Sequence, residues 1–388
     1  MHSHADHSRR AGGRKIYTLT HEFFPRRAGI AIFVEELARG AAASGHPIEV
    51  WAPDSEKLRE HAGLPFPVEL LPIRGGEDWP CLWKLSKEIY RRRRELREGT
   101  LFLAEPGPVR ACMHLGLVAA IPAGRVVLML YGSEIRRFTR SAHLRLELGR
   151  LLRRADRVGV MSGFAGKMLL HHFAFAAPKV RLVPGALRHD FALAPAPVSL
   201  GARPDDRKIV VLTVARIHPR KGQLCVVEAL ALLPLELRQR IEYRVVGLTD
   251  KAKYLRRLRQ TASASGVELR VVGEVSDDAL PAAYAEADVF AMTSVPYKDS
   301  VEGFGLVYLE AGASGLPVVA HDVGGVAAAV ESGETGLLVA PEDRAGLAAA
   351  ICRLVEDASY REKLGRNGLA RARERSWAEN AGVLFDGL

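Results

Sequence analysis

Residues 289–322 read VFAMTSVPYKDSVEGFGLVYLEAGASGLPVVAHD and contain one β–α–β repeat. The apolar run 289–294 predicts a strand, the stretch 295–305 a loop, and 306–315 a helix that leads into a second strand at 317–322. Strands that are apolar on both faces and alternate with helices are typical of a parallel sheet covered by helices. The stretch therefore predicts an α/β fold.

The same alternation extends along the chain on both sides of this repeat. Further strands are expected at 15–20, 47–53, 68–73, 100–106, 125–132, 157–162, 180–186, 208–216, 243–248 and 269–275. The stretch 191–206 interrupts the pattern with three prolines and two aspartates, which is typical of a linker. We therefore expect two doubly wound, Rossmann-like domains that face each other across a cleft, where such sheets bind their ligands.

The predicted domain limits follow from this pattern. Residues 1–14 are polar and lack periodicity, so we expect a disordered tail there. The N-terminal domain should span 15–197 and the C-terminal domain 198–375. The last segment, 376–388, should form a terminal helix that packs back on the N-terminal domain.

Composition limits the class of protein. Of the 388 residues, 48% are hydrophobic and 26% are charged, which is ordinary for a globular protein. We see neither a signal peptide nor an uncharged apolar run of about 18 residues, the length of a spanning helix. The four cysteines are scattered without metal-ligand spacing, as in a reducing compartment. We therefore expect a cytoplasmic protein, either soluble or peripheral on the inner face of the membrane.

The formal charge of +10 is concentrated in the first half of the chain. Residues 1–197 hold 31 Lys and Arg against 19 Asp and Glu, whereas residues 198–388 hold 24 against 26. A basic domain beside a nearly neutral one favours contact with an anionic membrane or substrate. The alternative is a general compositional bias towards arginine.

The loop and helix inside 289–322 form the first candidate site. Gly303 and Gly305 should leave backbone N–H groups open at the start of the helix, where a phosphate is favoured, and Phe304 can shield that site from water. Glu302 could face a ligand atom beyond the phosphate, and Glu310 could accept from paired hydroxyls such as those of a ribose. Alternatively, Glu302 is a helix-start carboxylate and Glu310 satisfies nearby backbone groups.

The second candidate site is VARIHPRKGQLCVVEAL, residues 214–230. Arg216 ends a predicted strand and Lys221 lies in the loop that follows it. Two cations at the carboxyl end of a strand suit a diphosphate. The alternative is a solvated loop, because runs of charge usually face water.

Two further candidates lie in the first half of the chain. Gly29 starts the first predicted helix and would let a ligand approach the backbone closely. Tyr131 and Glu134 follow the strand predicted at 125–132 and could bind a sugar or an acceptor hydroxyl. The alternatives are a plain strand–helix turn at Gly29, a rim residue at Tyr131 and a helix cap at Glu134.

Residues 79–97 predict a basic amphipathic helix whose apolar and charged residues fall on opposite faces. With Trp79 and Trp83 at its start, the helix could dock on anionic lipid. An ordinary surface helix that packs its apolar face on the sheet is the commoner case. We expect no nucleic-acid binding, because the aromatic residues are not interleaved with the basic ones as in single-strand binders.

Taken together, these stretches resemble the retaining glycosyltransferases of family four, which have the GT-B fold and include mannosyl- and glucosyltransferases of cell-envelope synthesis. SVEGFGLVYLEA is similar to the E-x7-E signature of that family. Other similar blocks are VARIHPRKG, GLPVVAHDVGG and, in the first half, FFPRRAGIAIFVEELARGAAASGH. The resemblance covers most of residues 15–375 and is strongest in the C-terminal domain.

The resemblance implies a role for each candidate residue. Arg216 and Lys221 would hold the diphosphate of a UDP- or GDP-linked sugar, and Glu302 would contact the donor sugar. The implied donor-binding set is Gly29, Val275, Gly303, Phe304, Gly305, Leu306 and Glu310, with Val275 near the base and Glu310 on the ribose. The family usually needs no metal, which agrees with two cations at the diphosphate.

Three positions depart from the family pattern: Tyr131-Gly132 replaces His-Gly, Ala28-Gly29 replaces Gly-Gly, and no glutamate follows Gly324-Gly325. We expect transfer of a sugar, with retention, from a nucleotide diphosphate-sugar to a hydroxyl of a glycan, lipid-linked or small-molecule acceptor. The alternative is a catalytically silent homologue that binds nucleotide sugar as a partner subunit, a hypothesis raised by Tyr131.

Overall fold

The structure is a computed structural model of the 388-residue chain. It describes residues 13–24, 29–59, 63–73, 75–76, 78–114, 121–191, 193, 207–298 and 300–388. The predicted tail lies outside the described residues apart from 13 and 14, and so does most of the predicted linker 191–206.

The chain divides into two compact units, and each is an α/β domain with a parallel sheet. The first unit comprises Met1–Pro184 and Ser376–Leu388, and the second comprises Gly185–Arg375. The sequence placed the boundary between the domains at 197/198 instead. The difference arises because the segment after Gly185 packs on the second unit, where the ring of Phe191 lies 5.9 Å from that of Tyr284.

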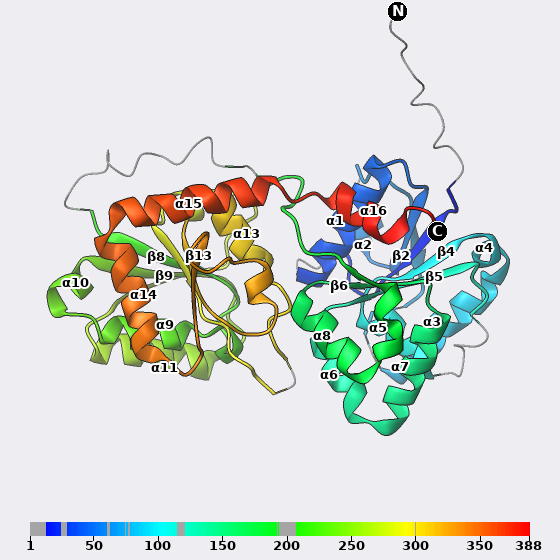
Figure 1. The fold of residues 1–388 in the computed structure, drawn as a ribbon, viewed down its shortest axis with the longest axis horizontal. Helices are drawn as coiled ribbons and strands as arrows, with labels where there is room; N and C mark the ends of the chain where they lie inside the picture. The colour runs from blue at the N-terminus through cyan, green and yellow to red at the C-terminus, as the bar shows by residue number, and fades with distance from the viewer. Residues whose placement is uncertain are drawn as a thin grey trace, which may run out of the picture. The chain divides into compact units, whose positions relative to one another are not determined.

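The first unit is built on a seven-stranded sheet in the order β3-β2-β1-β4-β5-β6-β7 (Figure 1). All its strand pairs are parallel, and Ile16 in β1 pairs with Ile48 in β2 and with Thr100 in β4. The strands are β1 Ile16–Leu19, β2 Ile48–Pro53, β3 Val68–Leu71, β4 Thr100–Leu103, β5 Arg125–Leu130, β6 Arg157–Val160 and β7 Val180–Leu182.

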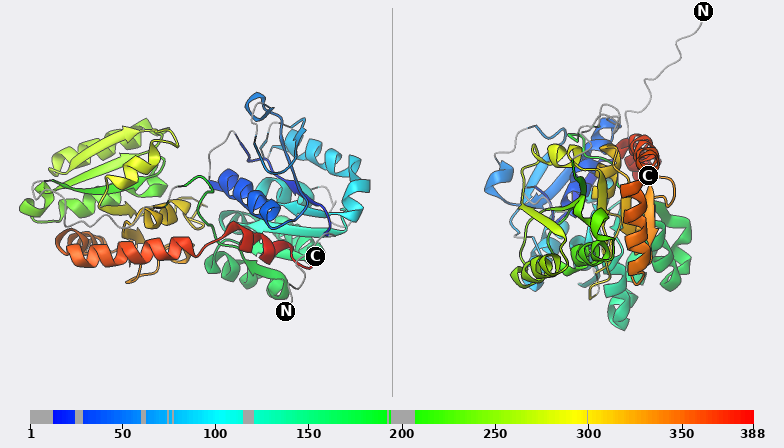
Figure 2. Two further views of the ribbon diagram at one scale, coloured as in Figure 1. Left: turned by 90° about the horizontal axis from the view of Figure 1, so that it is seen from above. Right: turned by 90° about the vertical axis from the view of Figure 1, so that its left-hand side faces the viewer.

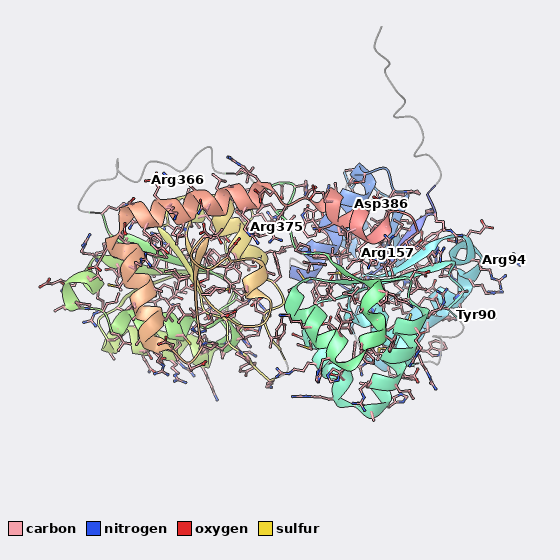
Figure 3. All side chains as sticks on the ribbon, in the orientation of Figure 1. Tyr90, Arg94, Arg157, Arg366, Arg375 and Asp386 are labelled. Atoms are coloured by element: carbon pink, nitrogen blue, oxygen red, sulfur yellow. The ribbon has the colours of Figure 1, made fainter. Side chains whose placement is uncertain are left out.

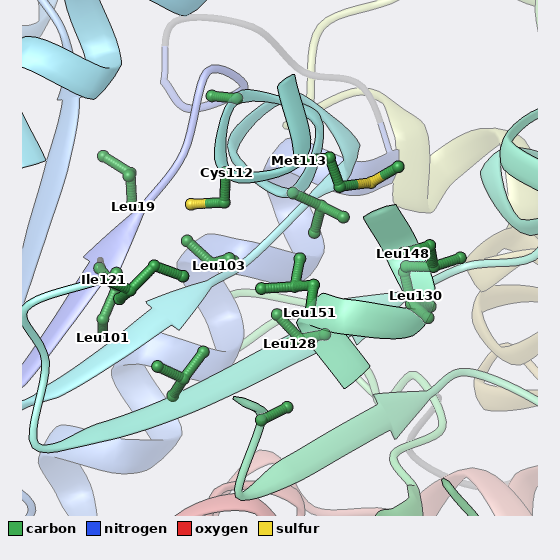
Figure 4. Close-up of a cluster of buried hydrophobic side chains, with 14 of the residues drawn as sticks. Leu19, Leu101, Leu103, Cys112, Met113, Ile121, Leu128, Leu130, Leu148 and Leu151 are labelled. Atoms are coloured by element: carbon green, nitrogen blue, oxygen red, sulfur yellow. The ribbon is translucent and has the colours of Figure 1, made fainter. Parts of the chain in front are cut away.

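Helices cover both faces of this sheet. Its described α-helices are α1 Gly29–Ala43, α2 Glu56–Arg59, α3 Trp79–Arg91, α4 Arg93–Glu98, α5 Pro106–His114, α6 Ser133–Arg140, α7 Ala142–Arg154, α8 Gly163–His172 and α16 Trp377–Phe385. On one face, α5 and α7 pack on β4 and β5 through a cluster that includes Leu101, Leu128, Met113 and Leu151 (Figure 4).

The other face is covered by α1 and by the last helix of the chain, α16 (Figure 2). The two helices approach closely at Gly40, where a Cβ atom would lie 2.4 Å from the backbone of Trp377. The rings of Phe33 and Trp377 are 5.1 Å apart across the same contact. The C-terminal helix thus completes the core of the first unit.

The second unit contains a six-stranded parallel sheet in the order β10-β9-β8-β11-β12-β13. The strands are β8 Ile209–Val214, β9 Ile241–Val246, β10 Glu268–Gly273, β11 Val289–Met292, β12 Val318–His321 and β13 Gly336–Val339. The described α-helices are α9 Gln223–Ala231, α10 Leu235–Gln239, α11 Ala252–Ala264, α12 Leu280–Ala285, α13 Leu306–Ala313, α14 Arg344–Glu356 and α15 Ala358–Arg373. Helices α9, α11 and α14 lie on one face, and α13 and α15 lie on the other (Figure 1).

In each sheet the strand order reverses once, between β1 and β4 and between β8 and β11. Loops that leave two strands on either side of such a reversal diverge and leave a crevice at the carboxyl edge of the sheet. No described helix is both long and apolar enough to cross a membrane.

Candidate active site

The site in the second unit is built where the loops after β8 and β11 meet. The first loop contains the 3-10 turn Pro219–Lys221, and the second leads into α13. Gly222 adopts φ +72°, and its Cα is so close to the second loop that a Cβ atom would lie 1.8 Å from the carbonyl oxygen of Thr293. The hydroxyl of Thr293 donates to the carbonyl of Gly222 at 2.8 Å. A glycine is therefore required where the two loops touch.

A buried carboxylate, Glu302, lies at the centre of this contact. Its Oε2 accepts from Lys221 Nζ at 2.8 Å, from Arg220 Nη1 at 3.3 Å and from Ser294 Oγ at 2.9 Å. Its backbone carbonyl accepts from the N–H of Gly325, which belongs to the loop after β12, at 2.8 Å. Three loops at the carboxyl edge of the sheet are thus joined through one residue.

The charges around this carboxylate determine how it ionises. Burial by itself raises the pKa of Glu302, but Lys221 and Arg220 oppose that effect and bring the pKa down to about 2. For Lys221, burial lowers the pKa, as do Arg220 and Arg216, and Glu302 raises it in part. Glu302 is therefore ionised at neutral pH, and its negative charge is shared among an excess of positive groups.

Helix α13 begins beside this cluster and presents open backbone donors. Gly305 is its N-cap, with φ +85°. Among the described residues, none accepts a hydrogen bond from the N–H groups of Gly303, Phe304, Gly305 or Leu306. The Phe304 side chain is buried, with the Arg375 guanidinium 5.3 Å from its ring centre. Open donors at a helix start, next to cations, can accommodate an anionic group.

Arg216 takes a different position from Lys221. Its side chain is exposed, and its carbonyl accepts from the Gln223 side-chain amide at 2.9 Å. The structure therefore brings Lys221 and Arg220 together on Glu302 and leaves Arg216 at the surface of the same loop. The sequence treated Arg220 only as part of a charged run, and its position next to Lys221 was the one available signal.

Glu310 lies on α13 within a separate polar group. Its Oε2 accepts from the Tyr284 hydroxyl at 2.8 Å. Burial raises the pKa of Glu310, while the Tyr284 hydrogen bond and the charge of Arg188 lower it in part. Arg188 is itself held by Asp190 and Asp277, at 2.9 Å and 3.2 Å. Neither Tyr284 nor Arg188 was identified from sequence, because Tyr284 lies in an alanine-rich stretch without a motif and Arg188 was assigned to the other domain.

Two further residues that were predicted to contact the donor lie at the ends of secondary-structure elements. Val275 lies half-buried in the loop after β10, which is an edge strand of the second sheet. Gly29 is exposed at the first position of α1, and a Cβ atom there would meet nothing within 4 Å. The entry-loop residue Ala28 lies outside the described residues.

Tyr131 and Glu134 are both buried at the end of β5. The Tyr131 hydroxyl donates to the Ala104 carbonyl at 2.7 Å. Glu134 accepts from the backbone N–H of Tyr131 and, at 3.2 Å, from that of Gly132, the N-cap of α6. Burial raises the pKa of Glu134, although these backbone hydrogen bonds oppose the increase. The carboxylate therefore has the contacts of a helix cap.

A comparable loop junction occurs in the first unit, where Glu105 follows β4. Its carboxylate accepts from the N–H of His21, after β1, at 2.8 Å and from that of Gly107 at 2.7 Å. The sequence did not predict this junction, because His21 and Glu105 are 84 residues apart and neither belongs to a motif that names the other as its partner. Within the described part of the chain, no group of three or more His, Cys, Asp and Glu side chains could hold a metal ion.

Comparison with known proteins extends over both units. Residues 201–371 match the family described as glycosyl transferases group 1, and residues 27–191 match glycosyltransferase family 4. A GDP-mannose-dependent alpha-(1-6)-phosphatidylinositol monomannoside mannosyltransferase of Mycolicibacterium smegmatis is 30% identical over 329 residues, which is 80% of this chain and 81% of that protein.

The chain belongs to glycosyltransferase family 4. This confirms the resemblance inferred from the E-x7-E motif. A D-inositol 3-phosphate glycosyltransferase of Salinispora tropica is 36% identical over 192 residues, covering 47% of this chain and 38% of that protein.

Solved structures confirm the GT-B class of this glycosyltransferase. Sucrose-phosphate synthase from Thermosynechococcus elongatus aligns with a TM-score of 0.74 at 22% identity, covering 95% of this chain and 96% of that one. HepE from Anabaena, in complex with UDP, aligns with a TM-score of 0.73 at 21% identity, covering 95% of this chain and 97% of that one. At these identities the likeness supports the fold alone.

Proposed function

We propose that this glycosyltransferase moves a sugar, with retention of anomeric configuration, from a nucleotide diphosphate-sugar to a hydroxyl of a glycan, lipid-linked or small-molecule acceptor. The observation that carries the proposal is the cluster of Lys221, Arg220 and Glu302 beside the open amides of α13. Negative charge grows on the diphosphate as its bond to the sugar breaks. Preorganised positive groups at that point stabilise the transition state.

Each predicted residue has a proposed role in this chemistry. Lys221 and the exposed Arg216 bind the diphosphate together with the N–H groups of Gly303–Leu306. Glu302 contacts the donor sugar and keeps Lys221 in place. Since fixed cations supply the positive charge, the proposed reaction needs no metal ion.

The remaining donor and acceptor contacts are proposed in the same way. Glu310 accepts from the ribose hydroxyls, and Val275 lies at the base. Gly29 lets a ligand approach the backbone at the start of α1 closely, and Tyr131 and Glu134 are assigned to the acceptor or sugar side. The leaving phosphate takes the proton of the acceptor hydroxyl, so the reaction needs no side-chain base.

The relatives support particular substrates. The Mycolicibacterium relative uses GDP-mannose and acts on phosphatidylinositol monomannoside. We therefore take GDP-mannose as the first donor and a lipid-linked hydroxyl as the first acceptor to test, with UDP-sugars as the other donor class.

The charge distribution supports a location for the reaction. The excess of 31 basic over 19 acidic residues in 1–197 favours peripheral contact with an anionic membrane. We propose that the protein works in the cytoplasm, on the inner face of that membrane.

A binding panel followed by a transfer assay tests the proposed function. Thermal shift with GDP-, UDP- and ADP-sugars should identify one stabilising nucleotide, because ligands stabilise the state they bind. With that donor, NMR should show a product with the donor's anomeric configuration, and EDTA should leave the rate unchanged. Nucleotide binding without transfer or donor hydrolysis would instead favour the silent-homologue hypothesis, and an inverted product would contradict retention.

A further inference from the structure

Helix α3 uses its apolar face entirely inside the first unit. Leu82, Leu85 and Ile89 are buried in the core, and Leu85 is fully inaccessible. This is the face that a conventional amphipathic helix would insert into lipid. Membrane contact through the leucine face of α3 is therefore excluded in the folded protein.

The opposite face of the same helix carries exposed aromatic side chains. Trp79, Trp83 and Tyr90 have relative exposures of 59%, 52% and 60%. Together with Lys87 they recur at spacings of four, four and three residues, so they form one stripe along the helix. Such large exposed apolar groups on one face indicate an interaction surface.

Basic side chains flank this stripe. Lys84, Lys87, Arg91 and Arg94 are exposed, and Figure 3 shows Tyr90 and Arg94 at the outer surface near α3 and α4. Lys87 Nζ lies 5.6 Å from the Trp83 ring centre. Among the described residues, no carboxylate lies within ion-pair distance of Lys84 or Lys87, whereas Arg91 pairs with Glu88 at 2.7 Å. The surface therefore combines aromatic rings with uncompensated positive charge.

We propose that this aromatic–basic face of α3, formed by Trp79, Trp83, Lys84, Lys87 and Tyr90, docks on an anionic lipid surface. Trp and Tyr favour the headgroup level of a bilayer, because their rings are apolar with one polar atom. Lysines beside them attract anionic headgroups. The inference rests on the membrane contact proposed above and names the surface that makes it.

Charge complementarity is the reason to choose lipid as the occupant. A second copy of the chain would bring Lys84 and Lys87 against the same cations, which is unfavourable without intervening acidic groups. Anionic lipid supplies mobile negative charge over the whole stripe. Self-association through α3 is therefore an outcome that would count against the proposal.

Vesicle flotation with matched variants tests the aromatic part. The wild-type chain should float with phosphatidylcholine vesicles that contain phosphatidylserine or phosphatidylinositol, and not with phosphatidylcholine alone. Trp79→Ala with Trp83→Ala should weaken the partition coefficient about tenfold or more. The control is Leu232→Ala with Leu235→Ala in the second unit. These two leucines are 60% and 57% exposed, and their substitution should leave the partition coefficient unchanged.

A charge-reversal pair tests the basic part. Lys84→Glu with Lys87→Glu should reduce partition more than Arg256→Glu with Arg257→Glu, which makes the same charge change on the exposed surface of α11. Equal losses from both pairs would show a general charge effect and overturn the assignment to α3.

Tryptophan fluorescence gives an independent readout. The other two tryptophans, Trp51 and Trp377, are 0% and 7% exposed, so a change on vesicle binding reports on Trp79 and Trp83. We expect a blue shift and quenching by brominated lipid, both lost in Trp79→Phe with Trp83→Phe.

Three results would overturn the inference. They are unchanged flotation of the Trp79→Ala/Trp83→Ala variant, sedimentation that shows a dimer lost in that variant, and failure of the wild-type chain to bind any anionic vesicle. The last would also remove the proposed membrane contact. Nucleotide-induced thermal shift should persist in every α3 variant, so failure of the docking surface is distinguishable from failure of the proposed transfer reaction.

Discussion

Glu302 and Lys221 form a largely buried ion pair with 2.8 Å between Oε2 and Nζ, although they are 81 positions apart in the chain. The pair joins the loops that leave β8 and β11, the two strands between which the order of the second sheet reverses. Arg220 and Ser294 donate to the same carboxylate oxygen as Lys221. One negative charge therefore faces two positive charges, and the cluster keeps a net positive charge. This arrangement leaves the site attractive to an anion.

Lys221→Ala should lower kcat/KM for sugar transfer by about 100-fold or more, because one fixed donor to the developing charge is lost. Steady-state kinetics with the donor found by thermal shift measures this change. Lys208→Ala is the control, since Lys208 forms an exposed pair with Glu268 in the same unit. Near-normal transfer by a folded Lys221→Ala protein would contradict the diphosphate role.

Arg216→Ala and Arg220→Ala should separate ligand binding from stability. Because Arg216 is exposed, Arg216→Ala should weaken nucleotide diphosphate binding about tenfold. The same substitution should change the free energy of unfolding by less than about 0.5 kcal/mol. Arg220 contacts Glu302, so its loss should also cost about 1 kcal/mol of stability. Calorimetric binding and urea unfolding measure the two effects, and unaltered nucleotide affinity in Arg216→Ala would remove that residue from the site.

Glu302→Gln should change how stability depends on pH. The pKa of Glu302 is lowered to about 2 in the folded chain, below its ordinary 4.5. Ionised Glu302 therefore contributes about 3 kcal/mol to the free energy of unfolding. This contribution is present above pH 4.5 and is lost as the pH falls towards 2. Urea unfolding of both proteins from pH 7 to pH 3 should show the stability difference shrinking with acid. If the stability difference between the two proteins stays constant from pH 7 to pH 3, the pKa of Glu302 is not lowered in the folded chain.

Glu310→Gln tests the ribose contact through a double-mutant cycle. If Glu310 accepts from the ribose, removing the 2′-hydroxyl from the nucleotide should weaken binding to the wild-type chain about tenfold. The same 2′-deoxy nucleotide should lose little further affinity in Glu310→Gln. Equal losses of affinity in both proteins would show that the ribose does not contact Glu310. The control is Tyr284→Phe, which removes the hydrogen bond from Tyr284 to Glu310 and keeps the carboxylate.

Gly222→Ala should destabilise the second unit by about 3 kcal/mol or more, because its Cβ would overlap the Thr293 carbonyl at 1.8 Å. Gly266→Ala is the matched control. Gly266 has a similar φ of +65° but nothing within 4 Å of its Cβ position, so only the conformational cost of about 1 kcal/mol applies. Thermal unfolding measures the destabilisation caused by each substitution. Equal destabilisation would show that the two loops are not in close contact at Gly222 in solution.

Much of the fold could be predicted because its signals are local. Each β–α–β repeat carries its own apolar period and its own turn residues, so strands such as Ile209–Val214 and Val318–His321 lie where the sequence predicted them. The E-x7-E motif placed Glu302 before α13 and Glu310 within it for the same reason. The domain boundary was less predictable, since residues 185–191 are assigned by long-range contacts such as that of Phe191 with Tyr284.

What the sequence alone determined was therefore the α/β pattern, the family and the positions of candidate residues along the chain. Only the tertiary structure decided which of them meet. Arg220 contacts Glu302 and Arg216 does not, and the loop that carries both arginines touches the loop after β11 at Gly222. The leucine face of α3 is in the core and its tryptophans face water. Both outcomes depend on which surface each segment buries against residues far away in sequence, and local periodicity carries no information about those distant partners.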